Sequence, residues 1–308
     1  MSGDYQLVQL ASGAKTLFSA SYGEKMHPGL GPAAEADLLY VRQLQICERM
    51  QSGAGEFVVW DIGLGGAANA TALLRATREI SGRLHIVSFD NTAEPLEFAL
   101  KNAAALNYSV GYEAQLAELL DARRAQFQNG NCSVVWEFHL GDFPAWLVSG
   151  TVGRASSRAA CELSSPARED ARPTNNAPAP NAIFFDAFSP AKNPAMWTLP
   201  VFANLFRTLD PQRPCALTTY SRSTMIRATL LLAGFFVGVG HATGLKEETT
   251  VAANTPALLA EPLNARWLER VLRSDSAEPL REPVYARAPL APATVEKLHR
   301  HPQFLMTE

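Results

Sequence analysis

The sequence predicts an α/β fold in which helices cover both faces of one doubly wound, Rossmann-like sheet. From Phe57 onward, short apolar runs alternate with helix-length segments, a rhythm typical of such sheets. The runs are apolar on both faces, as parallel strands are when helices cover them. A glycine-rich turn follows the first run, at the strand–helix junction where Rossmann-like folds have one. The expected strands are 57–62, 84–89, 134–140, 182–185, 215–220 and 235–239.

The chain is expected to have three parts. Residues 1–50 form an N-terminal extension, with a small hairpin over 5–19 and a helix that begins at Pro32. Residues 51–254 carry the alternating pattern of the sheet. Residues 255–308 form a C-terminal helix followed by a proline-spaced extended tail.

One segment of the central part departs from the alternation. Residues 149–180 are rich in Ala, Ser, Arg, Pro and Asn and have no sustained apolar period. This composition predicts a flexible insertion between two core strands rather than a domain boundary.

The composition excludes several classes of protein. The net charge of −3 gives no basic surplus, which counts against a nucleic-acid partner. The four cysteines form no CxxC pair and the six histidines form no HxH or HExxH motif, so we expect neither a disulfide framework nor a metal site. The N-terminus lacks a signal-peptide pattern, and the most apolar run, 228–240, is too short to cross a bilayer. We therefore expect a cytoplasmic protein without a membrane span.

The turn after the first expected strand predicts a nucleotide-type ligand. Gly63 and Gly65 let the backbone approach a ligand closely, and the following helix offers free N–H groups. Asp90 ends the next strand, where its carboxylate can accept hydrogen bonds from ribose hydroxyls. Read as Gly63-x-Gly65-x-x-Ala68, the turn also satisfies a dinucleotide fingerprint. The alternative without a ligand is a tight strand–helix turn beside a solvated Asp90.

Two features favour S-adenosylmethionine over a dinucleotide. Asp61 lies just before the glycines, where a carboxylate disfavours a pyrophosphate but suits a ligand with an ammonium group. Asp142 follows the third strand, where it can accept a hydrogen bond from an adenine amino group, and Phe143 beside it can pack on the ring. For Asp142, a helix N-cap is an equally good interpretation.

The segment from Ala182 to Trp197 predicts a catalytic edge of the sheet. An apolar strand delivers Asp186 to the carboxyl edge, where open α/β folds bind ligands. Phe188 follows it in a rigid turn, and Asn193-Pro194 begins a helix. An acid followed by an aromatic residue suits a reaction that orients an amine and removes its proton.

This segment carries a family resemblance. Asp186-Ala-Phe-Ser-Pro-Ala-Lys-Asn-Pro-Ala-Met-Trp-Thr resembles the signature of MnmC-type tRNA methyltransferases. The stretch from Thr16 to His27 is similar to that family's entry segment, and the likeness runs from about Leu7 to Ala253.

The resemblance implies a class I S-adenosylmethionine-dependent methyltransferase fold. It also implies methylation of the exocyclic amine of 5-aminomethyl(-2-thio)uridine at the wobble position, with the tRNA anticodon region as partner. Asp186 would be the general base or orienting group, and Phe188 would line the pocket. Gly63 and Gly65 would pass close to the methionine moiety, and Asp90 would hold the ribose. The residues that would close over cofactor or substrate are Tyr22, His27 and Glu35.

The substrate assignment has further candidates and open alternatives. Lys192 is a candidate phosphate contact, and Trp197 a candidate base-stacking residue, although a core position is the commoner one for tryptophan. Arginines of the insertion are a candidate basic arm, with a solvated loop as the alternative. The tail after Asn254 has no second glycine turn, so we expect a methyltransferase domain without a fused FAD oxidase.

Three rival functions remain open from the sequence. A methyltransferase or aminopropyl transferase acting on a small amine fits the mild acidity. An NAD(P)-dependent oxidoreductase fits the glycine turn, and a degenerate fold could serve as a non-catalytic partner-binding module. The presence of Asp61, Asp90 and Asp186 together disfavours the last. The oligomeric state is not indicated.

Overall fold

The computed structural model describes residues 3–149, 177–243 and 247–305, and its centre is one eight-stranded sheet. The strand order is β10-β11-β9-β8-β4-β5-β7-β6. Neighbours from β9 to β7 pair in parallel, whereas β6 and β11 pair antiparallel with their neighbours. The strands are β4 (Glu56–Ile62), β5 (Gly82–Asp90), β6 (Arg124–Asn129), β7 (Cys132–Leu140), β8 (Ala182–Phe185), β9 (Ala216–Thr219), β10 (Phe236–Gly240) and β11 (Thr249–Ala253).

All six strands expected from the sequence lie in this sheet, but two more belong to it. Strand β6 alternates buried and exposed side chains at the sheet edge, and the two-residue turn Gly130-Asn131 joins it to β7 as a hairpin. Strand β11 is made of threonines, alanines and one valine, so it gives no apolar run. The sheet is therefore mixed rather than wholly parallel.

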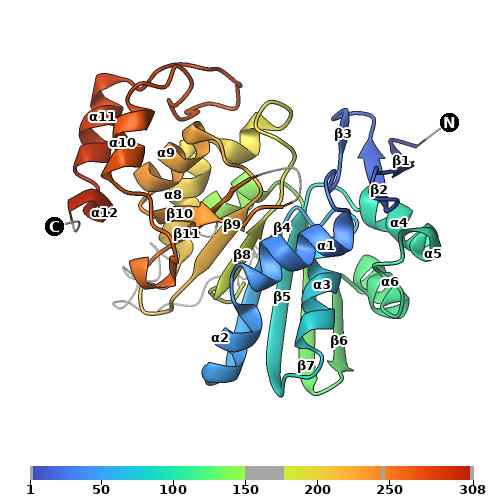
Figure 1. Ribbon diagram of the computed structural model, residues 1–308. Helices are drawn as coiled ribbons and strands as arrows, with labels where there is room; N and C mark the ends of the chain where they lie inside the picture. The colour runs from blue at the N-terminus through green and yellow to red at the C-terminus, as the bar shows by residue number, and fades with distance from the viewer. Residues whose placement is uncertain (1–2, 150–176, 244–246, 306–308) are drawn as a thin grey trace, which may run out of the picture.

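Alternate residues of each strand feed two separate cores. Phe57 and Val59 of β4 join one core, while Val58 and Trp60 join the other. The first core is closed by the helices α1 (Pro32–Ala36), η1 (Asp37–Arg42), α2 (Ile46–Ser52), α3 (Ala68–Thr77) and α6 (Glu113–Ala122). The second is closed by α8 (Leu199–Thr208), α9 (Thr224–Ala233), α10 (Ala265–Val271) and α11 (Pro292–His299). This three-layer arrangement, with α1, α2 and α3 in front of the sheet in Figure 1, confirms the predicted fold class.

The helix expected from Pro32 is divided into three pieces. After α1 the chain forms the π-helix η1, and Gln45 in the left-handed region separates η1 from α2. π-Helical turns are uncommon and are frequent at functional sites. This one turns Tyr40 into the core with no exposed surface.

The N-terminal hairpin is confirmed, and it forms part of a small second sheet. Strands β1 (Tyr5–Gln9), β2 (Lys15–Ser19) and β3 (Glu24–Lys25) pair antiparallel. Tyr5 and Leu17 pack with Ala99 and Leu106, which belong to α4 (Glu94–Lys101) and α5 (Ala103–Leu106). The small sheet thus lies beyond the carboxyl ends of β4 and β5, at the upper right in Figure 1.

The C-terminal part is more helical than the sequence predicts. The expected helix is confirmed as α10, but α11 and α12 (Pro302–Leu305) replace the expected extended tail. Both begin at a proline, whose missing N–H costs nothing at a helix start. Gln303 fixes this part, because its Nε2 donates to the carbonyls of Val237 and Leu263 at 2.7 Å each.

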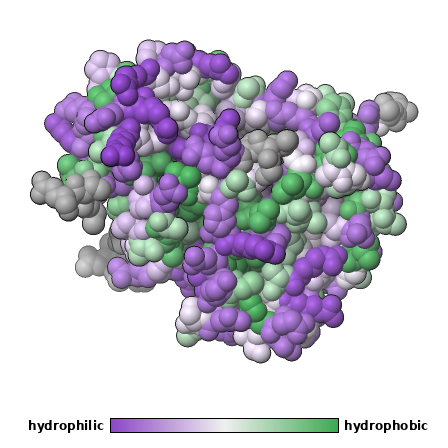
Figure 2. All heavy atoms as spheres, viewed as in Figure 1, coloured by the Kyte–Doolittle hydropathy of each residue, from purple (hydrophilic) through white to green (hydrophobic). Residues whose placement is uncertain are grey.

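The outer face of these C-terminal helices is polar. Figure 2 shows hydrophilic side chains dominating the surface over α10 and α11, at the upper left. Of the expected insertion 149–180, residues 150–176 lie outside the described residues.

Gly234, which ends α9, tests the packing of α8 on α9. Its φ is +110°, and an added Cβ would lie 2.8 Å from Cε1 of Phe206. We expect Gly234→Ala to lower the free energy of unfolding by about 1–3 kcal/mol, measured by urea denaturation. Gly82→Ala is the matched control, because a Cβ there meets nothing within 4 Å. Equal stability of the two variants would contradict this packing.

Candidate active site

A cavity of about 530 Å³ opens at the carboxyl ends of β4, β5 and β8. This volume lies in the usual range for small-molecule sites, and the position is the ligand-binding edge of α/β sheets. Of the residues predicted for the site, the cavity is lined by Tyr22, His27, Glu35, Gly63, Gly65, Asp90, Asp142, Phe143, Asp186 and Phe188.

The glycine turn needs its glycines for two different reasons. Gly63 has φ +92°, and an added Cβ would lie 2.8 Å from the carbonyl oxygen of Asp186. Gly65 has φ +51°, and a Cβ there would lie 3.3 Å from Sδ of Met26. The turn therefore contacts the end of β8 on one side and the N-terminal segment on the other.

Asp90 holds the glycine turn from the neighbouring strand. Its Oδ2 accepts a hydrogen bond from the Gly65 N–H at 2.9 Å, and its Oδ1 accepts one from the Thr92 N–H at 3.3 Å. Burial raises the pKa of Asp90, and these backbone hydrogen bonds oppose the rise. Each carboxylate oxygen has a second lone pair, so Asp90 can still accept from a ligand in the cavity that it lines.

Asp61 was predicted to face the ligand, but the structure places it away from the cavity. Its side chain is fully buried and does not line the cavity, because β4 carries it into the sheet. Ser88 Oγ donates to Oδ2 at 3.1 Å, and Oδ1 has no hydrogen-bond partner among the described residues. Burial, opposed by the Ser88 hydrogen bond, raises the pKa of Asp61 to about 8. The Asp61 carboxyl group therefore does not contact a ligand in the cavity directly.

Asp142 and Phe143 also line the cavity. Oδ1 of Asp142 accepts from the Ala145 N–H at 2.6 Å, so Asp142 caps the helix formed by residues 143–149. The N-cap interpretation is thus confirmed, and the exposed Asp142 also borders the cavity. Phe143 packs edge-on against Phe89, with ring centroids 4.9 Å apart.

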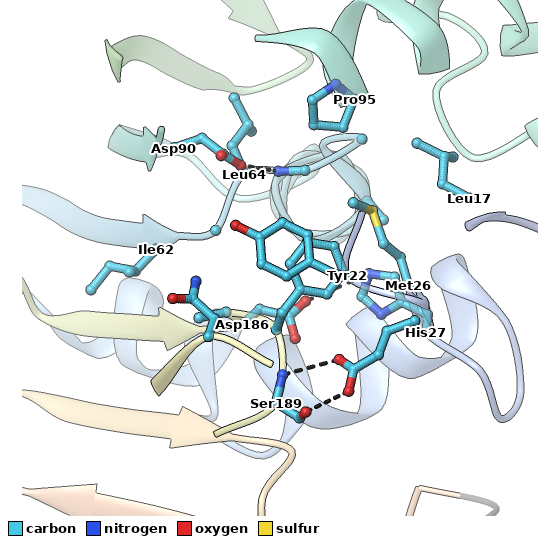
Figure 3. A pocket seen from close by; sticks show the side chains of 18 of the residues that line it. Leu17, Tyr22, Met26, His27, Ile62, Leu64, Asp90, Pro95, Asp186 and Ser189 are labelled. Atoms are coloured by element: carbon cyan, nitrogen blue, oxygen red, sulfur yellow. Dashed lines mark hydrogen bonds and ion pairs between the residues drawn. The ribbon is translucent and has the colours of Figure 1, made fainter. Parts of the chain in front are cut away.

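Asp186 is held by side chains from distant parts of the chain. Asn69 Nδ2 donates to its Oδ2 at 2.8 Å, and Nε2 of His27 lies 3.6 Å from the same oxygen. The other ring nitrogen of His27, Nδ1, lies 3.9 Å from Oε2 of Glu35. Figure 3 shows His27 on one side of the cavity and Ile62, at the end of β4, on the other.

The turn after β8 is tied to the N-terminal segment. The backbone N–H of Ser189 donates to Oε2 of Glu24 at 3.1 Å, and its hydroxyl donates to Oε1. The dashed lines at Ser189 in Figure 3 mark this pair. Beside it, the rings of Tyr22 and Phe188 stack with centroids 4.1 Å apart and planes 16° from parallel.

The predicted base-stacking role of Trp197 is wrong. Trp197 has no exposed surface and packs against Phe185 and Phe202 in the core. Its Nε1 donates to the carbonyl of Phe188 at 2.7 Å, so it supports the turn from below. Lys192 is exposed outside the cavity lining, with Nζ near Gly23 at the cavity mouth.

Three site residues were not predicted from the sequence. Asn69 is a lone amide in the apolar helix α3, and a buried polar residue in such a helix is the signal that could have marked it. Tyr40 lies near Asp186, and burial together with that carboxylate raises its pKa well above the ordinary range. For Glu24 the sequence carries no signal, because its contact with Ser189 spans 165 positions.

Neither a metal site nor a membrane span is found in the described part of the chain. The described ranges hold no group of three or more His, Cys, Asp or Glu side chains placed to bind a metal ion. Among the same residues, no helix has the length and apolarity to cross a membrane.

The buried Asp61 makes a prediction about pH. The pKa of the Asp61 carboxyl rises from 3.8 to about 8 on folding. The folded state therefore binds this proton more tightly than the unfolded state does, and protonation stabilises it. This stabilisation is complete below the unfolded value and is lost as the pH rises through the folded value. Between about pH 5 and about pH 8.5 we expect the wild type to lose a few kcal/mol more than Asp61→Asn. Urea denaturation at both pH values measures this, with exposed Asp275→Asn as control, and equal losses would contradict it.

Comparison with known proteins agrees with this geometry. A family model described as S-adenosyl-L-methionine-dependent methyltransferase matches residues 168–255. The chain is 27% identical over 269 residues to the "tRNA 5-methylaminomethyl-2-thiouridine biosynthesis bifunctional protein MnmC" of Cupriavidus necator. The aligned region covers 82% of this chain and 36% of that protein. The protein with the same description from Burkholderia vietnamiensis is 28% identical, covering 71% of this chain and 31% of its own length. The chain thus spans about a third of the length of these curated relatives.

A solved structure shows the same fold. The crystal structure of MnmC2 from Aquifex aeolicus aligns with 97% of this chain and 85% of that chain, with a TM-score of 0.62 and 23% identity. The likeness to MnmC-type proteins predicted from the sequence is thereby confirmed, as are the cofactor class and the fold. Residues 168–255 thus match an S-adenosyl-L-methionine-dependent methyltransferase family, and the described chain has the fold of the MnmC2 structure.

Proposed function

We propose that the chain methylates the aminomethyl nitrogen of a tRNA wobble uridine, converting 5-aminomethyl-2-thiouridine to 5-methylaminomethyl-2-thiouridine. The observation that carries this proposal is the position of Asp186, whose carboxylate lines the cavity next to the glycine turn. A carboxylate can accept a hydrogen bond from an amine N–H, which orients the amine and leaves the nitrogen lone pair free to react. The MnmC relatives, described as proteins of 5-methylaminomethyl-2-thiouridine biosynthesis, support the choice of acceptor.

The residues around the glycine turn fit S-adenosylmethionine. Gly63 and Gly65 keep the floor of the cavity free of side chains, so the backbone can meet the methionine part. Asp90 has acceptor capacity for the ribose hydroxyls, and Phe143 offers an apolar wall for the adenine. Asp61 is buried outside the cavity lining, and its pKa of about 8 keeps it largely protonated near neutral pH, so it does not pair with the ligand ammonium.

The chain's own residues supply alignment and proton handling. When bound, S-adenosylmethionine would supply an activated methyl group for transfer to the amine. Asp186 orients the amine, and the Asn69 amide fixes the carboxylate. Such alignment can contribute on the order of 7–11 kcal/mol to lowering a barrier.

The cavity mouth suits a planar base carried by a polyanion. The stacked rings of Tyr22 and Phe188 border the cavity and offer a surface on which a pyrimidine can pack. The exposed Lys192 lies at the same mouth, where its charge can meet a phosphate.

A free small amine is the second candidate acceptor. The net charge of −3 favours it, because a polyanion is repelled by an acidic protein unless local cations compensate. Methylation of small amines in the absence of RNA, with no activity on tRNA, would select this candidate.

Asp186→Asn tests the assignment of the acceptor site. We expect turnover on tRNA that bears aminomethyl-thiouridine to fall about 100-fold or more, because the carboxylate no longer accepts the amine proton. Affinity for S-adenosylhomocysteine, measured by calorimetry, is expected to stay within about twofold of wild type. The exposed Asp275→Asn, which removes the same charge elsewhere, serves as control. A variant with wild-type turnover would remove Asp186 from the mechanism.

Lys192→Glu tests the RNA interface. We expect tRNA affinity to drop several-fold and the slope of log affinity against log salt to become shallower by about 1, because one phosphate contact is lost. Filter binding over a salt series measures both quantities. Lys297→Glu, on the remote helix α11, makes the same change of net charge and is expected to have little effect. Identical behaviour of the two variants would place the RNA elsewhere.

A further inference from the structure

His27 lies between two carboxylates at the acceptor end of the cavity. Its Nε2 lies 3.6 Å from Oδ2 of Asp186 and its Nδ1 lies 3.9 Å from Oε2 of Glu35. The side chains of His27 and Glu35 are each 10% exposed, and that of Asp186 is 17% exposed. We propose that His27 is a positioning residue of the proposed methylation, which takes up the proton of the substrate ammonium through Asp186.

The chemistry of the acceptor requires such a group. A primary alkylammonium, for which lysine with a pKa near ~10.4 is a guide, has no lone pair at neutral pH. A carboxylic acid, with an ordinary pKa near ~4, orients an amine well but retains its proton poorly. An imidazole, near ~6.5, is a better base at the pH of a cell. The carboxylate alone therefore leaves the removal of the proton incomplete.

The proton has a defined route. An N–H bond of the ammonium breaks and the proton passes to the Asp186 carboxylate, which hands it to Nε2 of His27. The imidazolium that forms carries one positive charge between the carboxylates of Asp186 and Glu35, which stabilise it. After the methylated product leaves, the imidazolium releases the proton to water.

The backbone holds His27 in place for this role. Its φ is +50°, a region that few non-glycine residues occupy and that is frequent at functional sites. Met26, the preceding residue, is anchored on β2 because its N–H donates to the carbonyl of Leu17 at 2.8 Å and its carbonyl accepts from the Thr16 hydroxyl. The Glu35 carboxylate is fixed in turn by the Gly29 N–H.

Other titratable groups face the same carboxylate and must be distinguished from His27. Tyr40 on η1 and Tyr220 after β9 are neutral over the assay range, because burial and the Asp186 charge raise the pKa of each well above 10. Asp61 and Glu24 also face this region. Because the pKa of Asp61 is about 8, the Asp61→Asn variant is measured in parallel.

The pH profile of His27→Gln tests the proposal, because glutamine can donate to Asp186 but cannot take up a proton. We expect kcat on aminomethyl-thiouridine tRNA near pH ~7 to fall about 10- to 100-fold, with KM for tRNA and affinity for S-adenosylhomocysteine nearly unchanged. The loss is expected to shrink toward pH ~9.5, where the substrate amine loses its proton unaided. An equal loss at every pH, or none at any pH, would overturn the role of His27.

A second measurement is independent of the acceptor. NMR titration of the His27 imidazole in the full chain gives its midpoint without any substrate, and Asp186→Asn is expected to lower that midpoint by about half a pH unit or more. Exposed Asp275→Asn is expected to leave it unchanged. An unchanged midpoint in Asp186→Asn would overturn the relay. If the midpoint shifts but the wild type does not methylate tRNA, the proposed tRNA acceptor is wrong, whereas the interaction between His27 and Asp186 is supported.

Discussion

The site depends on one close contact between backbones, that of Gly63 with Asp186. The place of a side chain on Gly63 is filled by the Asp186 carbonyl, so the turn after β4 and the end of β8 touch directly. The strand ends are joined by two more bonds, from the Gly63 N–H to Phe89 and from the Asp186 N–H to Ile62, each 2.9 Å. Three parallel strands thereby bring the cofactor turn, Asp90 and the acceptor carboxylate to one edge of the sheet.

The N-terminal segment completes this edge instead of standing apart from it. Glu24 binds the turn after β8, Met26 covers Gly65, and His27 approaches Asp186. A sheet alone would leave the cavity open to water on that side. Because the hairpin packs on α4 and α5, the N-terminal segment is held at this edge by its own apolar contacts.

Negative charge is concentrated around the cavity. The carboxyl groups of Asp90, Asp186 and Glu35 line it, whereas the buried Asp61, whose pKa is raised to about 8, is largely protonated near neutral pH. Such a cluster is costly without a cation, because like charges in a poorly solvated site repel. A sulfonium and an amine are the kinds of ligand that relieve it, which agrees with the proposed reaction.

The sequence by itself determined the three-layer fold, the glycine turn and the acids that end β5 and β8, because strand periodicity and strand–helix turns are local properties. It also carried the MnmC likeness. Only the tertiary structure decided that Trp197 is core, that Asp61 is closed to the cavity, and that Glu24 and Asn69 belong to the site. The partners of Asn69 and Glu24 lie 117 and 165 positions away, and contacts at that distance are set by how layers pack rather than by any local pattern.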